Sequence, residues 1–307
     1  MRLGYAPWKG TQLVAVVTDL TAFLDESGIQ DDARFFVLAG YIGSPRQWSL
    51  FDEAWRQALT IVPGLESFHA QDFFGAKGPY RALEEEVKHR MLMALTRAVS
   101  SHRLFPFGAI IETPVFKSLS YGERRFLTGG LFSEDGRWVT SGAPNRPYFM
   151  AFQHCLSVAA KLTKPGKSVN FVFDRQDAYA PRALETFEQV RELMTPEEER
   201  KKIGGCAFLL EGEVTALQAA DMLAHCWYQG ATEAFNAIDA ATPDAVRRLE
   251  VAARQRRHQA FHLLTDSKGT SHMHYFKEKE DFEGWLKHLP DDLRLRLHSS
   301  TGPSPRI

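Results

Sequence analysis

Residues 21–28 read TAFLDESG, a short run of small and apolar residues that is followed at once by two acids. The apolar run has the composition of a buried strand, and Ser27 and Gly28 supply a turn that ends it. The strand therefore brings Asp25 and Glu26 to its own carboxyl end. Turn chemistry alone explains acids at such a position equally well, as residues that face water. Their role depends on the rest of the chain.

Apolar patterns on both sides of this stretch predict a mixed α/β fold. The run at 35–42 is a second strand, close enough to the first to form a hairpin with it. After it, segments of strand composition alternate with segments of helical periodicity, and such alternation predicts a mixed sheet with helices packed on its faces. Further strands are expected at 104–112, 168–174 and 204–210, and helices at about 45–59, 81–101, 148–164, 181–194 and 214–229.

Composition places the chain among globular proteins of a reducing compartment. With 307 residues and 44% hydrophobic content, it can bury a full core in one large domain with insertions. The three cysteines show no CxxC or zinc-like spacing, which indicates free thiols. The first residues lack the apolar core of a signal peptide, and no run is long enough to cross a membrane. We expect a cytoplasmic protein without a membrane partner; its oligomeric state stays open.

The charge balance bears on nucleic-acid binding. The formal net charge is −1, from 37 basic and 38 acidic residues. A protein that holds nucleic acid mainly through its phosphates usually has a basic bias, so this balance argues against strong non-specific binding. A local basic groove stays possible. Two basic clusters, at 200–202 and 254–258, lie in helix-like, acid-flanked stretches that are typical of solvated faces.

Two further acids lie in apolar surroundings. The strand VNFVF runs directly into Asp174, as the first strand runs into Asp25. In EVTALQAADMLAHCWY, Asp221 lies on the inward face of a helix that is apolar almost all round, with Gln218 and His225 beside it. A lone buried carboxylate is costly and requires a partner. That partner is either a lysine or arginine in a structural ion pair, or a metal ion.

Converging carboxylates suit magnesium or manganese. Both ions prefer hard oxygen ligands, and Mg²⁺ usually keeps several waters and completes its shell with substrate phosphate. Two such ions about 4 Å apart activate water and stabilise the leaving oxygen in phosphodiester hydrolysis. If Asp25, Asp174 and Asp221 meet, Mg²⁺ or Mn²⁺ is the expected cofactor.

Several motifs together resemble one family. FLDESG, the strand that ends in Asp174, and ALQAADMLA are similar to motifs of the DUF3800 family of uncharacterised bacterial proteins, which resembles the ribonuclease H-like superfamily. The pairing of DESG with LQxAD is the strongest match, and FFVLAGYI and FHAQDF fit the same pattern. The resemblance spans roughly residues 21–230. It implies a ribonuclease H-like mixed sheet flanked by helices, with helical insertions.

The resemblance also implies roles for individual residues. Asp25, Asp174 and Asp221 would bind the metals, and Glu26 would be a fourth ligand or support one. Glu112 also ends a strand and could take the place of Asp174 as the ligand. Of the two, we prefer Asp174. The other candidates lie near these acids: Gln218 and His225, one helical turn before and after Asp221, are expected to support a ligand or belong to the core, and His69 is either a loop histidine or a residue placed for proton transfer.

These observations lead to a functional hypothesis with one alternative. We expect a metal-dependent phosphodiesterase or nuclease whose substrate is DNA or RNA. The alternative is a ribonuclease H-like module that binds nucleic acid or a protein partner without cutting it. The catalytic domain is expected at 13–230, a helical C-terminal extension at 231–295 and a disordered tail at 296–307.

Overall fold

The computed structural model describes residues 19–133, 137–175, 177–193, 197–238 and 272–287. In this part of the chain the strands are β1 (Leu20–Ser27), β2 (Phe35–Gly43), β3 (Phe105–Glu112), β4 (Val169–Asp174), β5 (Ile203–Leu209) and β6 (His272–Phe276). The α-helices are α1 (Pro45–Leu59), α2 (Ala70–Phe74), α3 (Glu85–Ser101), α4 (Thr113–Ser118), α5 (Tyr121–Leu127), α6 (Tyr148–Leu162), α7 (Ala180–Leu193), α8 (Glu197–Arg200), α9 (Thr215–Ile238) and α11 (Lys279–Leu286). Two short 3₁₀-helices are η1 (Gly78–Tyr80) and η2 (Glu211–Glu213).

The strands form one mixed sheet in the order β5-β4-β1-β2-β3-β6. β2 pairs antiparallel with β1 on one side and with β3 on the other, which confirms the hairpin predicted around DESG. β4 and β5 extend the sheet on the other side of β1, parallel to it and to each other, and β6 pairs parallel with β3. The predicted α/β class, a mixed sheet flanked by helices, is therefore confirmed.

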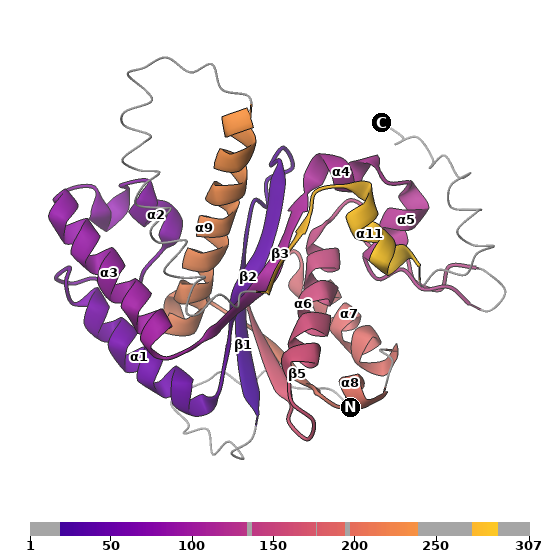
Figure 1. The fold of residues 1–307 in the computed structure, drawn as a ribbon, viewed down its shortest axis with the longest axis horizontal. Coiled ribbons are helices and arrows are strands. Elements are labelled where there is room, and N and C mark those ends of the chain that lie inside the picture. Colours follow the sequence, from indigo (N-terminus) through magenta and orange to yellow (C-terminus); the bar gives the residue numbers. More distant parts are fainter. Residues whose placement is uncertain (1–18, 134–136, 176, 194–196, 239–271, 288–307) are drawn as a thin grey trace.

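Helices cover both faces of the sheet, as Figure 1 shows. One face, here called the α9 face, carries α1, α2, α3 and α9, while the opposite α6 face carries α4 to α8 and α11. Each face has its own hydrophobic core, and β2 is buried along its whole length because it contributes to both. The central strands are thus shielded on both sides.

Side chains of β1 and β4 alternate strictly between these two cores. Leu24 and Phe173 pair in register and both belong to the core of the α6 face. Phe23 packs against the core of the α9 face instead. Because successive side chains of a strand point to opposite faces, Asp25 and Asp174 point to the α9 face, and Glu26 to the α6 face.

The helix that follows β2 begins as the sequence predicts. Ser44 is the N-cap of α1: its hydroxyl accepts a hydrogen bond from the backbone N–H of Gln47, and the Gln47 side chain accepts one from the Ser44 backbone. Pro45 occupies the first turn, where its missing N–H costs nothing. The buried residues of this helix include Trp55, which becomes important at the candidate site.

Gly28, the last residue of DESG, fits α9 closely against the β1–β2 turn. Its φ is +80°, in the left-handed region, and a Cβ built on it would lie 2.1 Å from the carbonyl oxygen of Phe35 and 2.7 Å from the ring of Tyr228. Only glycine combines that backbone conformation with such close packing. The turn and the helix that carries Asp221 are therefore in direct contact.

The region beyond residue 230 is the expected helical extension only in part: α11 is helical, but residues 272–276 are a strand. α9 continues to Ile238, and residues 272–276 form β6, which adds an edge strand to the sheet beside β3. Its aromatic side chains, Tyr275 and Phe276, suit a strand that packs on a core. The predicted tail at 296–307 and the start of the predicted domain, 13–18, lie outside the described residues. No helix in the described ranges has the length and apolar character needed to span a membrane.

Candidate metal centre

Two aspartates end neighbouring parallel strands on the same face of the sheet. Leu24 pairs with Phe173, so Asp25 and Asp174 follow at the next step of the register. Asp25 is buried, with 5% of its surface exposed, and Asp174 is partly exposed. The Asp25 carboxylate accepts a hydrogen bond of 2.7 Å from the backbone N–H of Glu26. The sequence prediction that these two acids meet at one edge of the sheet is consistent with this register.

The third predicted acid, Asp221, reaches the same place from α9. It is 7% exposed, and α9 packs on β1 and β2 across the α9 face. Burial raises the pKa of Asp25, and the negative charges of Glu26, Asp221, Asp174 and Glu211 raise it further. Asp25 therefore lies within electrostatic reach of both Asp174 and Asp221.

Glu211 is a member of the cluster that the sequence analysis did not identify. It lies in η2, just after β5 ends at Leu209, so it is a third acid that follows a parallel strand. Its backbone N–H donates a hydrogen bond of 2.9 Å to the carboxylate of Asp174. The signal was available, because the strand-then-acid pattern that marks Asp25 and Asp174 recurs in the run FLLEGE.

His69 completes the cluster. Its Nε2 lies 4.0 Å from the Glu211 carboxylate, and its Nδ1 lies 3.6 Å from that of Asp72. One potential ligand atom from each of His69, Glu211 and Asp221 lies within 4.8 Å of the other two. The side chain of His69 is 45% exposed, so solvent reaches the cluster from this side.

Two side chains of α9 hold the segment that carries His69. The Gln218 side-chain oxygen accepts hydrogen bonds from the backbone N–H of Phe68, at 3.0 Å, and from the indole N–H of Trp55, at 2.9 Å. The Asp221 carboxylate accepts one from the backbone N–H of Ala70, at 2.6 Å. His69 is thus flanked by two anchored residues. The segments FHAQDF and LQAAD are therefore joined by hydrogen bonds in this structure.

The cluster is strongly acidic and shares protons in the absence of a cation. Burial, the charge of Asp221 and a hydrogen bond to it raise the pKa of Glu211 to about 10. Burial also raises the pKa of Asp221, although the hydrogen bond from Ala70 and the nearby His69 act in the opposite direction. A pKa raised this far favours the protonated form of Glu211 at neutral pH.

No lysine or arginine pairs with these carboxylates in the described part of the chain. None of the salt bridges there joins a lysine or arginine to Asp25, Asp174, Glu211 or Asp221. A structural ion pair, the alternative considered for Asp221, is therefore not observed among these residues. Buried carboxylates without a counter-charge are costly, and they are typical of sites that bind an external cation.

The remaining candidates lie beside the cluster or away from it. Glu112 ends β3, two strands from β1, and forms a salt bridge of 2.6 Å with Arg34. It therefore does not take the place of Asp174. Glu26 points to the α6 face, where its charge raises the pKa of the buried Tyr148. Its place on that face argues against the predicted role as a ligand that shares a metal with Asp25.

His225 makes an aromatic contact at the edge of the site. Its ring stacks on Phe74 of α2 with centroids 5.1 Å apart and an interplanar angle of 6°. This contact packs α2 against α9. Because α2 begins directly after His69, it also supports the position of that residue. The predicted supporting position of His225 beside Asp221 is consistent with this arrangement.

Comparisons with known proteins add no relative to this description. A scan of family models, a search of curated proteins and a search of solved structures each return no match.

Proposed function

We propose that this chain is a metal-dependent phosphodiesterase that hydrolyses nucleic acid. The observation that carries the proposal is the convergence of Asp25, Asp174, Glu211 and Asp221, with His69 beside them, at the carboxyl ends of three parallel strands. Among the described residues no lysine or arginine forms a salt bridge with these four acids. Ligand and catalytic sites of open α/β sheets commonly lie at this edge. The site is solvent-accessible at His69, so a substrate can reach it.

The donor set fits a divalent cation. Four carboxylates offer the hard oxygens that Mg²⁺ and Mn²⁺ prefer, and the imidazole of His69 extends the set toward Mn²⁺ or Zn²⁺. The proton held by Glu211 and the raised pKa values of Asp25 and Asp221 are the expected state of such a set before a cation binds. Asp25, Asp174, Asp221 and Glu211 would hold the metal, with Mg²⁺ or Mn²⁺ as our proposed ions.

The chain's own residues supply position and proton transfer. A bound divalent cation would lower the pKa of a coordinated water and stabilise charge on a phosphate. Gln218 and Asp221 fix the backbone on both sides of His69, which holds the imidazole at the open side of the cluster. There, His69 can accept or deliver a proton, and the carboxylate of Asp72 lies 3.6 Å from its Nδ1.

The fold supports a ribonuclease H-like assignment. An antiparallel unit of three strands, β1 to β3, is extended on the β1 side by the parallel strands β4 and β5, and the acids lie on β1, after β4 and on the last core helix. This is the arrangement implied by the resemblance to DUF3800 proteins. In this proposal β6 is an addition to the shared sheet, contributed by the region after residue 230.

A cleavage assay with separate readouts tests this function. The protein is incubated with single- and double-stranded DNA and RNA in Mg²⁺ or Mn²⁺, and binding is measured in parallel with Ca²⁺. We expect cleavage by the wild type, none by Asp25→Asn, and unchanged or tighter binding by that variant because it loses a negative charge. Glu53→Gln, which removes one charge from the exposed surface of α1, should cleave like the wild type. Binding without cleavage in either metal would instead support a non-catalytic nucleic-acid-binding module.

A further inference from the structure

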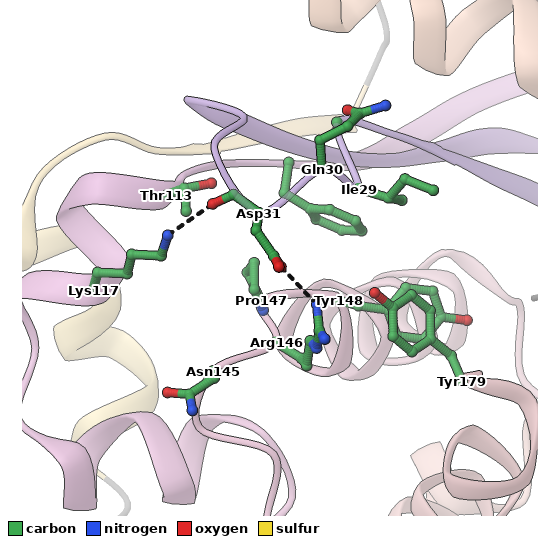
Figure 2. Close-up of a pocket in the computed structure, with 12 residues that line it drawn as sticks. Ile29, Gln30, Asp31, Thr113, Lys117, Asn145, Arg146, Pro147, Tyr148 and Tyr179 are labelled. Atoms are coloured by element: carbon green, nitrogen blue, oxygen red, sulfur yellow. Dashed lines mark hydrogen bonds and ion pairs between the residues drawn. The ribbon is translucent and has the colours of Figure 1, made fainter. Parts of the chain in front are cut away.

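A second feature lies at the same end of β1, on the opposite face of the sheet. A pocket there is lined by the β1–β2 turn, by Lys117 of α4, and by Arg146, Tyr148 and Tyr179, as Figure 2 shows. None of these residues belongs to the carboxylate cluster. The pocket and the cluster are nevertheless linked by one strand, because the turn begins at Gly28, three residues after Asp25.

The pocket brings two cations to one acid. Arg146 forms a salt bridge of 3.0 Å with the Asp31 carboxylate, and Lys117 donates a hydrogen bond of 3.0 Å to the backbone oxygen of Asp31 (Figure 2). In the described residues Lys117 has no carboxylate within salt-bridge distance. The side chains of Arg146 and Asp31 are 46% and 91% exposed, and such surface pairs contribute little to stability. Arg146 can therefore exchange Asp31 for a stronger anionic ligand.

The opposite wall is aromatic. Tyr148 and Tyr179 stack with ring centroids 4.9 Å apart, and the guanidinium of Arg146 lies 5.8 Å from the ring of Tyr179. Tyr179 is partly exposed, whereas Tyr148 is only 2% exposed and its hydroxyl has no hydrogen-bond partner in the described part of the chain. The pocket thus offers an aromatic face, two cations and a buried hydroxyl that lacks a partner. Proteins bind single-stranded nucleic acids with this combination of stacking and phosphate contacts.

The position of the pocket fits the same substrate as the cluster. The turn that lines the pocket begins at Gly28, directly after β1 ends at Ser27, so the pocket and Asp25 lie at the same end of this strand. Among the described residues no lysine or arginine forms a salt bridge with the acidic cluster, and the net charge of −1 gives no general attraction for a phosphate chain. We propose that this pocket binds one nucleotide of a single-stranded substrate, with Arg146 and Lys117 on its phosphate and Tyr179 against its base.

This inference rests on the proposed function for its substrate, but its test reads binding alone. Fluorescence anisotropy measures the affinity of the Asp25→Asn protein, in Ca²⁺, for labelled single-stranded oligothymidylate and oligouridylate of twelve nucleotides over a range of salt concentrations. The pocket variant adds the two substitutions Arg146→Ala and Lys117→Ala together to this Asp25→Asn protein. The matched control is the double variant Arg191→Ala with Lys201→Ala, which also removes two positive charges. In the wild type, Arg191 pairs with an acid on α7, and Lys201, just after α8, pairs with acids on α8.

The salt dependence distinguishes a built site from general charge. Loss of the contacts with this one phosphate should reduce the slope of log affinity against log salt by about 0.7, and the control pair should leave it unchanged. Tyr179→Ala should weaken binding about tenfold, while Tyr179→Phe should retain it, because stacking needs only the ring. Equal slopes for the pocket and control pairs, or no binding of either oligonucleotide, would overturn the proposal. Cleavage by the wild type is scored separately, so failure of the pocket and failure of the nuclease function are distinguishable.

Discussion

The carboxylate of Asp221 accepts a hydrogen bond of 2.6 Å from the backbone N–H of Ala70, although the two residues are 151 positions apart in the chain. Through this bond, the acid on α9 also positions the neighbouring His69. One side chain therefore serves both the acidic cluster and the loop that opens onto it. The predictions below separate these structural contributions from the metal site itself.

Gln218 should be a structural residue of high importance. Gln218→Ala leaves the indole N–H of Trp55 and the backbone N–H of Phe68 buried without an acceptor. Each such loss costs about 1–3 kcal/mol, so we expect the free energy of unfolding to fall by about 2–5 kcal/mol in urea denaturation. Gln57→Ala, on the exposed face of α1, is the control and should change it by less than about 0.5 kcal/mol. A Gln218→Ala protein as stable as the control would contradict the anchoring role.

Gly28 and Gly64 offer a matched pair for the contact between the turn and α9. Both have positive φ, +80° and +76°, but a Cβ on Gly64 would meet nothing within 4 Å. Gly64→Ala should therefore cost about 1 kcal/mol from backbone strain alone, and Gly28→Ala several kcal/mol because its Cβ also collides with Phe35 and Tyr228. Thermal unfolding of the two variants provides the comparison. Equal losses would mean that the packing of α9 against the turn contributes nothing.

Glu211 should make the metal-free protein less stable as pH rises. A carboxyl group with a raised folded pKa stabilises the fold below its unfolded pKa, and this contribution is lost as pH rises toward the folded value of about 10. In EDTA, the unfolding free energy of the wild type should fall as pH rises from about 7 to about 8.5. In Glu211→Gln this fall should be less steep, by up to about 1.4 kcal/mol per pH unit. An unchanged slope in the variant would show that Glu211 already ionises in the folded protein.

His154 should produce the opposite dependence at lower pH. It lies on α6 against the rings of His274, Phe276 and Trp285, and burial, with help from His274 and Lys161, lowers its pKa to about 3. Since the unfolded chain binds this proton near pH 6.5, stability should fall as pH drops below that value.

A substitution separates His154 from other acid-sensitive groups. His154→Phe should unfold with a smaller loss of free energy between pH 6.5 and 5 than the wild type, by about 1–2 kcal/mol. His89→Phe, at an exposed position of α3, is the control and should keep the wild-type dependence. Chemical denaturation at each pH gives the measurement. Identical pH profiles for wild type and His154→Phe would mean that the buried imidazole does not resist protonation.

Local patterns were enough to predict five of the six described strands and three acids of the cluster. Asp25 and Asp174 follow apolar strands, and Asp221 interrupts the inward face of an apolar helix, so each was visible within a window of about ten residues. The face of Glu26 was also available, because alternation from the buried Leu24 places it opposite Asp25. That reasoning requires knowing that both faces of the sheet are covered, which the sequence of β1 alone does not reveal.

The parts that sequence reasoning missed depend on contacts between distant segments. Gln218 acts through Phe68 and Trp55, which are 150 and 163 positions away, and no local pattern indicates those bonds. β6 forms because residues 272–276 pair with the edge strand β3. The helical composition of the neighbouring residues therefore gave the wrong expectation for this stretch. Tertiary pairing overrides local preference at such edges.

The central claim, that these carboxylates hold a divalent cation, is tested most directly by diffraction from crystals soaked in MnCl₂. Anomalous difference density at the manganese edge should lie among the side chains of Asp25, Asp174, Glu211 and Asp221, and it should be absent from an Asp221→Asn crystal treated in the same way. Wild-type crystals that diffract well but show no manganese at this cluster, or show a lysine or arginine in its place, would contradict the account.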